Sequence, residues 1–373
     1  MQSTVMTLFR QSGFYSITWG ELLMIGVGLF LIYLAIFKKA EPLLLLPIGF
    51  GCILSNLPLG AALLEKGGFF ELINTYLIQT EIIPVLIFLG VGALTDFGPL
   101  IANPITLLIG ASAQIGIFIT FFIASMLNFS LMEAGAIGII GGATGPATIY
   151  TTIKLAPHLL GPIAVAAYMY MALIPIIQPP IMRLLTTKKE RSVVMEQLRP
   201  VSKTEKILFP IFISLIVAMI IPEASLLIGM FMLGNLLRES GVTDRLAKTV
   251  SNQFMDVLVI LIATAIGATM QADKFLTKGT LIIIGLGIIA FVTSTIGGLL
   301  FAKLLYYFTK GKVNPLIGSA GVSAVPMAAR ISQRVGQEEN PGNFLLMHAM
   351  GPNIAGAIGA IVAAGIMITL LIK

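Results

Sequence analysis

The chain has 373 residues, of which 57% are hydrophobic and 11% are charged, and its mean hydropathy is +0.98. Soluble domains carry about 25% charged residues, so this composition excludes a soluble globular class and predicts a polytopic membrane protein. A single cysteine, Cys52, excludes an internal disulfide framework. The net charge of +6 does not require nucleic acid, because many lysines and arginines fall between apolar runs, where the positive-inside bias places them.

The first half of the chain is a series of apolar runs separated by short polar segments. Membrane spans are predicted at residues 19–37, 42–57, 82–95, 104–127, 131–155 and 161–182. Residues 62–80 alternate polar and apolar side chains, which is typical of an amphipathic helix lying on the membrane surface. Asp96 and Asp273 each follow a span and are as well suited to cap a helix as to bind a ligand.

Residues 183–206 form the most polar segment of the chain. Their lysines and arginines predict a cytoplasmic loop that joins an N-terminal half, residues 1–182, to a C-terminal half, residues 207–373. The C-terminal half contains predicted spans at residues 207–221, 222–238, 254–271, 280–309 and 344–372. It also contains an amphipathic segment at residues 241–252 and an irregular apolar stretch at residues 314–330. The pattern predicts an all-α membrane protein with about ten to twelve membrane segments, two of which are broken or re-entrant.

Three blocks of the first half recur in the same order in the second half, at offsets of 175 to 180 residues. They are Pro42, Ile48 and Gly49 with Pro222, Ile228 and Gly229, Gly92-Ala93 with Gly267-Ala268, and residues 140–143 with residues 317–320. This indicates an internal duplication in which each half carries one broken helix. Duplicated transporters place their ion site where the repeats meet, near the bilayer midplane, so we expect the site at the paired breaks. An inverted orientation of the two repeats is our hypothesis.

The stretch from Gly138 to Tyr150 interrupts an apolar run in which a membrane helix should continue. It contains four glycines, a proline and three hydroxyl side chains, namely Gly138, Gly141, Gly142, Gly145, Pro146, Thr144, Thr148 and Tyr150. Glycine and proline release backbone carbonyls, which are tolerated at membrane depth only where protein or a water-filled cavity covers them. The stretch therefore predicts a broken helix that holds a small cation. A tight glycine-rich helix crossing or a simple loop is the alternative.

The second irregular stretch carries polar residues in otherwise apolar sequence. Asn314 and Ser323 offer neutral oxygens of the kind that Na⁺ accepts, and Gly318 would let another backbone approach closely. Arg330 is the only charge between Lys312 and Arg334, and an ionisable residue beside a span is a functional candidate. Alternatively, Arg330 marks a cytoplasmic helix end and pairs with Glu338 or Glu339.

Three further residues are candidates for a role at such a site. Asn353 lies beside Gly351 and Pro352 in the final span, where its amide suits a cation or serves as interhelical glue. Tyr170 lies in an uncharged span and needs a hydrogen-bond partner there, unless it marks the interface. His348 is more typical of a packed histidine than of a proton relay. The chain contains no GxSxG, Walker, CxxC or Rossmann motif, so chemistry beyond ion movement needs a group supplied by a partner.

Four long segments carry a family resemblance. They read GGATGPATIYTTIKLAPHLLGPIAVAAY, ALIPIIQPPIMRLLTTKKER, NPLIGSAGVSAVPMAARISQ and QEENPGNFLLMHAMGPNIAG. From about residue 19 onward the chain resembles the β subunit of the sodium-translocating biotin-dependent decarboxylases. The resemblance implies that a partner transfers the substrate's carboxyl group to biotin. Carboxybiotin, supplied in trans, would lose CO₂ at the β subunit with uptake of a proton, and the free energy would drive Na⁺ outward.

The resemblance also assigns roles to residues. Tyr170, Asn314, Gly318, Ser323, Arg330 and Asn353 correspond to positions that the family uses around its Na⁺ and carboxybiotin sites. We expect Thr144, Asn314, Gly318, Ser323 and Asn353 at the Na⁺ site, Arg330 and Ser323 at carboxybiotin, and catalytic roles for Arg330 and Tyr170. The first break departs from the family's GGADGPT, because Thr144 stands where the aspartate should be. A neutral site would bind Na⁺ more weakly and with a different pH dependence.

The expected function is therefore that of the membrane subunit of a Na⁺-pumping decarboxylase, in the prokaryotic inner membrane. The implied partners are the α carboxyltransferase, a biotin-carrier subunit, small γ and δ membrane subunits, the lipid bilayer and further copies of the chain, with no nucleic acid. A stand-alone Na⁺-coupled secondary transporter with inverted repeats is the alternative, and a non-transporting scaffold would leave the two breaks unexplained. The acid that is decarboxylated is not encoded in this chain, because another subunit binds it.

Overall fold

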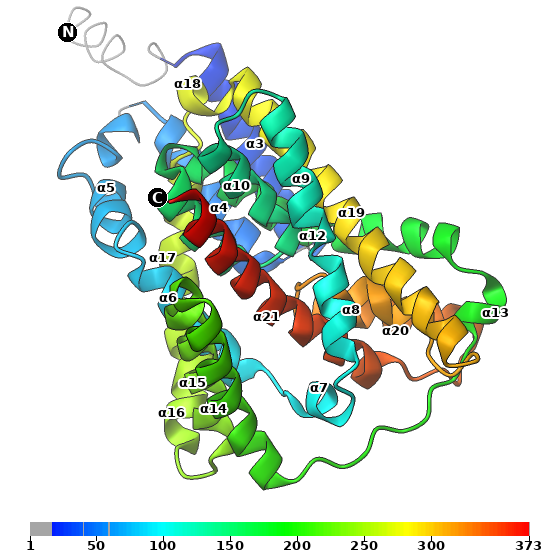
Figure 1. Ribbon diagram of the computed structural model, residues 1–373. Coiled ribbons are helices and arrows are strands. Elements are labelled where there is room, and N and C mark those ends of the chain that lie inside the picture. The colour runs from blue at the N-terminus through cyan, green and yellow to red at the C-terminus, as the bar shows by residue number, and fades with distance from the viewer. Residues whose placement is uncertain (1–16, 40, 59, 373) are drawn as a thin grey trace, which may run out of the picture.

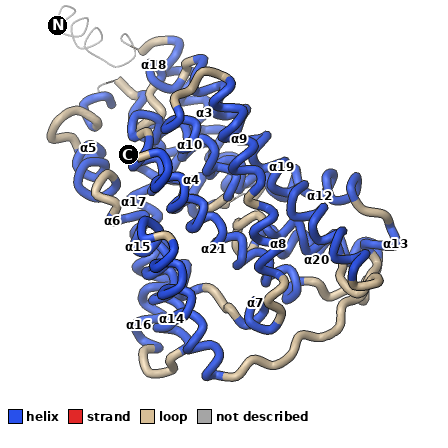
Figure 2. Tube along the Cα trace, in the orientation of Figure 1, coloured by secondary structure: helices blue, strands red, loops and turns tan. Residues whose placement is uncertain are grey.

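The computed structural model describes residues 17–39, 41–58 and 60–372, and all regular secondary structure in these residues is helical (Figure 2). The expected all-α class is confirmed for this part of the chain. By length and apolar composition, five helices here are able to cross a membrane, and seven are if each of two bent pairs counts as one span. Other apolar helices are shorter, so a total of ten to twelve membrane segments stays a prediction.

The helices of the first half follow the predicted apolar runs. Their bounds are α3 (Trp19–Phe37), α4 (Pro42–Asn56), α5 (Phe69–Ile73), α6 (Ile82–Leu94), α7 (Gly98–Ala102), α8 (Thr106–Ala113), α9 (Ile115–Met126), α10 (Leu131–Gly138), α11 (Gly145–Leu155) and α12 (Leu160–Leu185). Short 3₁₀ or π segments add η1 (Gly60–Leu63), η2 (Asn74–Ile78), η3 (Ile139–Gly142) and η4 (Pro157–Leu159). The last span bends by 61° between Pro157–Met171 and Leu173–Leu185.

The expectation of one amphipathic helix over residues 62–80 is wrong. Gly67 has a φ of +88°, and neither Gly67 nor Gly68 is helical, so the chain separates η1 from a helix over Phe69–Ile78. Glycine adopts this left-handed conformation at little cost, which explains why the helical run is interrupted there. The helix over Phe69–Ile78 meets α6 at 66°, so together they form a broken span or a re-entrant segment.

The predicted span at residues 104–127 is one apolar segment with a local break at Gln114. The backbone N–H of Gln114 donates to Ala111 at 3.0 Å, and the N–H of Ile117 donates to the carbonyl of Gln114 at 2.9 Å. Both bonds span three residues, so the chain tightens from α-helical to 3₁₀ geometry for one turn. This break separates α8 from α9.

Helices extend into both ends of the linker predicted at residues 183–206, so only residues 192–202 are non-helical there, and the second half follows them. Its helices are α14 (Lys203–Ile220), α15 (Ser225–Glu239), α16 (Asp244–Thr249), α17 (Met255–Ala268), α18 (Ala272–Phe275), α19 (Lys278–Phe308), α20 (Met327–Glu339) and α21 (Leu346–Leu371), with α13 (Lys188–Arg191) before the linker. Short segments are η5 (Pro222–Ala224), η6 (Val250–Phe254) and η7 (Pro315–Gly321). The separation expected between residues 241–252 and 254–271 is wrong, because the π turn η6 continues α16 directly into α17.

Two helix pairs join the halves through glycine contacts. At the crossing of α4 and α17, a Cβ added to Gly51 would overlap the carbonyl oxygen of Thr264, and one added to Gly267 would overlap that of Ile48. At the crossing of α6 and α15, Gly92 and Gly234 make the same contacts with Phe231 and Leu89. Each crossing therefore depends on one glycine from each half, which allows the backbones to touch.

Asparagine side chains close the same two crossings. Asn56, at the end of α4, donates its amide to the carbonyl oxygen of Met270 at 2.7 Å, just beyond α17. Asn235, near the end of α15, donates to the carbonyl oxygen of Thr95 at 2.8 Å, just beyond α6. Counted over the predicted spans, the second span of each half is thus fastened to the third span of the other half.

The later helices exchange partners in the same way. The sixth span of the first half, α12, packs on α19 of the second half, and α21 packs on α8 of the first half. Figure 1 shows α21 crossing the middle of the molecule. In the most apolar 18-residue stretch of each helix, 67% of the residues of α21 are buried, against 22% of those of α3. Helix α21 is therefore central and α3 peripheral.

Candidate functional site

The first break redirects the chain within three residues. After α10 and the 3₁₀ turn η3, Ala143 adopts a left-handed conformation with φ of +49°, and Thr144 is extended. Gly145 and Pro146 then begin α11, where proline is tolerated because the first helical N–H groups have no intrahelical partner. The predicted broken helix is confirmed, and its left-handed alanine costs on the order of 1 kcal/mol.

The second break also passes from a 3₁₀ turn through extended backbone into a helix, but without a left-handed residue. The 3₁₀ turn η7 is followed by extended Val322, and the chain becomes helical again at α20 from Met327. The irregular stretch predicted at residues 314–330 is thus confirmed, although its last residues form the first turn of α20.

Each broken segment starts and ends at the same end of the molecule. Glu133, in the first turn of α10, lies 2.9 Å from the Nε2 atom of His158, which follows α11. Asn314, before η7, and Asn343, after α20, both donate to the carbonyl oxygen of Arg191, at 2.9 and 3.0 Å. Both segments are therefore hairpins rather than spans.

The two hairpins enter from opposite ends. The 26-residue helix α12 connects the end at His158 with the end at Arg191, and a helix of that length spans about 39 Å along its path. We call the end that carries residues 186–202 the linker face and the end that carries residues 128–133 and 157–159 the far face. Figure 1 shows the linker running along one end of the molecule and α18 at the other.

The tips of the hairpins meet in the interior. The hydroxyl oxygens of Thr144 and Ser323 are 2.7 Å apart, and both side chains are buried. The Thr144 hydroxyl is also 3.2 Å from the carbonyl oxygen of Gly142. The two breaks, which are 179 residues apart in sequence, thus place two hydroxyls and a backbone carbonyl together. We call this contact the hairpin crossing.

Asn353 borders the hairpin crossing from α21. Its amide nitrogen donates to the carbonyl oxygens of Ala320 and Val322, at 2.9 and 2.8 Å, and so holds the second tip beside Ser323. Its side-chain oxygen is buried and has no hydrogen-bond partner among the described residues. An unpaired buried oxygen costs about 1–3 kcal/mol, so this atom is suited to accept a ligand.

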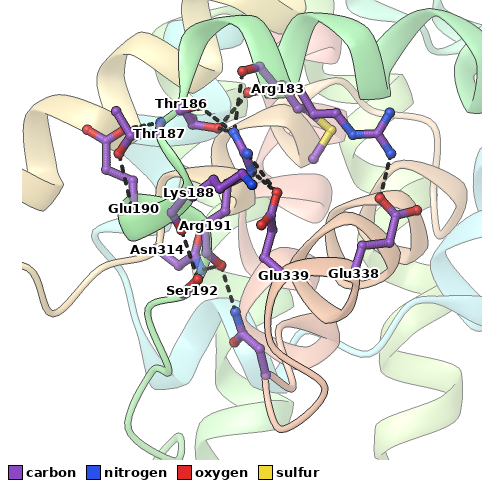
Figure 3. Close-up of polar contacts among 12 residues, drawn as sticks. Arg183, Thr186, Thr187, Lys188, Glu190, Arg191, Ser192, Asn314, Glu338 and Glu339 are labelled. Carbon is purple, nitrogen blue, oxygen red and sulfur yellow. Dashed lines mark hydrogen bonds and ion pairs between the residues drawn. The ribbon is translucent and has the colours of Figure 1, made fainter.

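Asn314 and Gly318 lie along η7 and away from the crossing. The amide nitrogen of Asn314 donates to the carbonyl oxygen of Arg191 (Figure 3) and to that of Val193. Its side-chain oxygen accepts the backbone N–H of Leu316. The 3₁₀ segment that follows rises about 2 Å per residue, which places Asn314 about 14 Å from the tip. A Cβ at Gly318 would overlap the carbonyl oxygen of Gly298 in α19, so this glycine permits close packing.

The suggested pairing of Arg330 with Glu338 or Glu339 is wrong. Glu338 binds Arg183 at 2.5 Å, and Glu339 binds the buried guanidinium of Arg191 at 2.6 Å (Figure 3). Arg330 lies in the first turn of α20, whereas Glu338 and Glu339 lie in its last turn, about 12 Å further along the helix. Arg330 is exposed and forms no ion pair within the described residues.

Tyr170 and Tyr168 face different surroundings. The hydroxyl of Tyr170 donates to the carbonyl oxygen of Ile284, and its ring lies against Gly287, so it joins α12 to α19. Tyr168 instead lies against Gly145, directly after Thr144, with its hydroxyl 2.8 Å from the Cβ position of that glycine. Sequence reasoning singled out Tyr170 and missed Tyr168 as the neighbour of the first tip, since alternating residues on one helix give no sign of which faces inward.

A cavity of about 550 Å³ lies beside the crossing. Its walls include Pro146 and Tyr168 from the first half and the segment 324–326 that follows Ser323, together with residues of α4, α6 and α17. Glu41 and Asp256 also line it. Burial raises the pKa of the Glu41 carboxyl, and the positive charge of Arg330 opposes this rise.

The cavity is located toward the linker face. Thr95, another lining residue, follows α6 and precedes Asp96. Asp96 binds Lys206 at 3.1 Å, in the first turn of α14 and directly after the linker. The hairpin crossing is therefore approached from the end that carries the linker.

No carboxylate belongs to the hairpin crossing itself, and the described residues contain no group of three or more His, Cys, Asp or Glu side chains that would hold a metal ion. The oxygens that converge there are neutral hydroxyl, amide and backbone oxygens. Hard cations bind such oxygens, and ion-coupled transporters hold Na⁺ with backbone carbonyls of broken helices.

Comparison with known proteins gives full-length matches. A family model described as "Na+-transporting oxaloacetate decarboxylase beta subunit" matches residues 20–371. Methylmalonyl-CoA decarboxylase subunit beta of Veillonella parvula is 57% identical over 370 residues, which cover 98% of this chain and 97% of that protein. Glutaconyl-CoA decarboxylase subunit beta of Acidaminococcus fermentans is 56% identical over 365 residues, with the same coverage. Oxaloacetate decarboxylase beta chain 2 of Salmonella typhi is 50% identical, with 97% of each chain covered.

These matches include both hairpins, the linker and the spans that pack around them. The chain therefore belongs to the family of β subunits of Na⁺-transporting oxaloacetate decarboxylases.

Proposed function

We propose that this multi-pass protein of the bacterial inner membrane couples decarboxylation of carboxybiotin, delivered by a partner subunit, to Na⁺ export. The contact between Thr144 and Ser323 carries the proposal, because it brings the two broken helices together at one buried point. A pump needs an ion site that both moving parts share, and oxygens from two hairpin tips provide one.

In this proposal Na⁺ is the transported substrate and binds at the hairpin crossing. Thr144, Ser323 and Asn353 are its side-chain ligands, and the carbonyl of Gly142 adds a backbone oxygen. Asn314 and Gly318, the other two residues expected at the ion site, do not contact the ion in this proposal. They hold η7 in place, Asn314 by its bond to Arg191 and Gly318 by close packing on α19. A Na⁺ ion would replace the hydrogen bond between the two hydroxyls, which would then turn their lone pairs toward the ion.

The cavity beside the crossing is the proposed site for carboxybiotin. Its volume of about 550 Å³ lies within the range of roughly 300–1,000 Å³ that is usual for small-molecule sites. When bound, this group supplies a carboxylate whose loss as CO₂ takes up a proton. Arg330 has a guanidinium without an ion-pair partner in the described chain, and we propose that it binds that carboxylate.

Ser323 links the two sites through the backbone. Its hydroxyl belongs to the hairpin crossing, while the next three residues, 324–326, line the cavity. A shift of this segment when the cavity empties would move an ion ligand directly. Tyr170, which joins α12 to α19, is proposed to position the mobile part of the protein in this state rather than to touch the reacting group.

We further propose that residues 1–182 and 207–373 are inverted repeats joined by a cytoplasmic linker. The reciprocal glycine crossings, the exchanged α12 and α21 contacts and the entry of the two hairpins from opposite ends all support this arrangement. Placing the linker face in the cytoplasm agrees with its lysines and arginines. The cavity would then open toward a soluble biotin carrier, as delivery by a partner requires.

The complex would contain the α carboxyltransferase, a biotin-carrier subunit and small γ and δ subunits, with more than one copy of the β subunit. The test is to reconstitute the purified complex into proteoliposomes and to measure ²²Na⁺ movement while the substrate acid is decarboxylated. Coupled movement that is lost in Ser323→Ala and Arg330→Met supports the proposal. Decarboxylation that is independent of Na⁺ would overturn it.

The stand-alone transporter makes a different prediction about which proteins co-purify with the chain. A tagged copy of the chain, purified under mild conditions from its native membrane, is probed with streptavidin for a biotinylated partner. Recovery of that partner in fixed proportion supports the decarboxylase subunit. Na⁺ exchange by the isolated chain with no biotinylated partner would favour the transporter.

A further inference from the structure

Gln114 is a buried amide in the wall of the hairpin crossing. Its side chain is 5% exposed and stands at the 3₁₀ turn between α8 and α9. The amide nitrogen donates to the carbonyl oxygens of Gly110 at 3.0 Å and of Gly356 at 3.3 Å. The side-chain oxygen, Oε1, has no hydrogen-bond partner among the described residues.

The two donor bonds determine which way the amide faces. Both neighbours of the nitrogen are carbonyl oxygens, so a flipped amide would place oxygen against oxygen. The unpaired Oε1 atom then points to the first break, where it lies 3.5 Å from the Cβ position of Gly142. Gly359, whose added Cβ would lie 3.0 Å from the Cγ atom of Gln114, confines the side chain from the other side.

Gln114 and Asn353 are built into the crossing in the same way. Each donates its amide nitrogen to two backbone carbonyls, and each leaves its oxygen buried and unpaired. They meet on α21, since Gln114 binds Gly356, less than one turn from Asn353. Gly356 in turn packs against the second tip, where its Cβ position is 3.4 Å from the backbone nitrogen of Ser323.

We propose that Gln114 is a further ligand of the transported cation, with Oε1 completing a shell of neutral oxygens at the hairpin crossing. This inference rests on the proposed function, because it adds a residue to the same ion site. The cation would then contact α8 and α9 as well as the two hairpins and α21. A 3₁₀ turn inside a long helix is common at functional positions, and here it presents Gln114 to the first break.

An unpaired oxygen alone does not mark a ligand. Asn235 is also fully buried, donates its nitrogen to the carbonyl oxygen of Thr95 and leaves its oxygen unpaired. It lies at the crossing of α6 and α15, whereas Gln114 lies beside Gly142. Asn235 therefore serves as a matched control for the loss of a buried amide.

The first experiment compares Gln114→Leu with Asn235→Leu in the purified complex, using ²²Na⁺ binding and the Na⁺ dependence of decarboxylation. Loss of an oxygen ligand should raise the half-saturating Na⁺ concentration about tenfold or more in Gln114→Leu. The Asn235→Leu variant should change it less than about twofold, whatever its effect on thermal stability. Thr144→Val is the positive control for the ion site.

The outcomes separate this inference from the proposed function. Weaker Na⁺ binding in Thr144→Val with unchanged binding in Gln114→Leu would overturn the role of Gln114 and leave the site intact. Unchanged binding in both variants would overturn the ion site itself. Equal weakening in Gln114→Leu and Asn235→Leu would show that Gln114 acts only through packing.

Gln114→Glu provides a second variant of nearly the same shape. A buried carboxyl holds its proton until a cation replaces it, so Na⁺ binding should acquire a pH dependence that the parent chain lacks. Below the pKa of that carboxyl, the half-saturating Na⁺ concentration should fall about tenfold for each pH unit of increase. A purely structural glutamine would not create this Na⁺-linked profile, and a flat profile in a folded variant would overturn the proposal.

Discussion

At the scale of single residues, Thr144 determines the electrostatic character of the ion site. Its hydroxyl contacts Ser323 and the carbonyl of Gly142, and no carboxylate joins them. A cation in this site would be held by dipoles alone, so its full charge would not be balanced nearby. Binding would be correspondingly weaker than in a site with a carboxylate, but it would not require release of a proton.

Replacing Thr144 by aspartate should strengthen Na⁺ binding. A carboxylate in contact with the ion adds direct charge attraction, so the half-saturating Na⁺ concentration should fall about tenfold at neutral or alkaline pH. The measurement is ²²Na⁺ binding to the purified complex, with Thr144→Asn as a neutral control of the same shape. Equal affinity in the parent chain and Thr144→Asp would argue against an ion site at this residue.

Asp96 illustrates a charge that contributes to stability at the linker face. Burial alone would raise its pKa, but the backbone N–H of Gly98 and the ammonium of Lys206 outweigh that effect, so the pKa is lowered. A carboxyl with a depressed folded-state pKa stabilises the protein above its unfolded-state pKa of about 3.9. That contribution is lost as the pH falls through the folded-state value.

Asp96→Asn should therefore lose stability at neutral pH and should show a weaker fall in Tm between pH 5 and pH 3 than the parent chain. The change should be modest, because the pair is partly exposed and therefore screened. Thermal unfolding of the detergent-solubilised complex measures it. Glu196→Gln, which removes an exposed carboxylate from the linker, controls for the general effect of charge. Matching pH profiles for Asp96→Asn and the parent chain would contradict this account.

At the scale of elements, the helix pairs that join the two halves depend on glycines, which have no side chain to separate the backbones. Gly92 and Gly234 let α6 and α15 touch, and Gly51 and Gly267 do the same for α4 and α17. In lipid the apolar surroundings provide little hydrophobic drive for helix association, so close packing must supply it. These glycines therefore matter more than their lack of chemistry suggests.

Gly92→Ala should separate α6 from α15, because the new methyl group meets a backbone carbonyl that has no free rotation. We expect a loss of about 1–3 kcal/mol, as for other overpacked cores. Gly26→Ala, in α3, adds the same methyl group where no atom lies within 4 Å, and it should be neutral or slightly stabilising. Tm and the yield of assembled complex measure both. Similar behaviour of the two variants would contradict the importance of the crossing.

At the scale of the whole molecule, the hairpin crossing brings together segments of both halves that enter from opposite ends. The first hairpin is anchored at the far face by Glu133 and His158, and the second is anchored at the linker face by the carbonyl of Arg191. A cation bound between their tips would tie the halves together. Its effect should therefore extend to the stability of the entire fold.

Na⁺ should raise the Tm of the purified complex relative to K⁺ at equal ionic strength. A ligand that binds only the folded state stabilises it by about 2.7 kcal/mol at a concentration one hundred times its Kd. The double variant Thr144→Val with Ser323→Ala should abolish most of this difference, while Gly26→Ala should preserve it. An equal Tm in Na⁺ and K⁺ for the parent chain would contradict ion binding to the folded state.

Much of this organisation could be predicted from the sequence. Apolar runs closed by charged residues identified most helices, and the clustered glycines and prolines near residues 138–150 and 314–326 located both breaks, since backbone freedom is a local property. Two of the errors concerned where a helix is interrupted. The interruption at Gly67 and the π turn that fuses α16 with α17 were missed, because helix continuity depends on tertiary packing as well as on apolar pattern.

By itself, the sequence determined the membrane class, the helical spans, the positions of the two breaks and the family. Only the tertiary structure decided which oxygens converge. In the folded protein Ser323 contacts Thr144, and Asn314 binds the carbonyl oxygen of Arg191 before the linker. Tyr168, rather than Tyr170, lies against the first tip, and the side-chain oxygen of Gln114 is unpaired. The physical reason is that composition and backbone freedom are local properties of the sequence. The neighbours of a buried polar atom depend instead on how helices far apart in sequence cross.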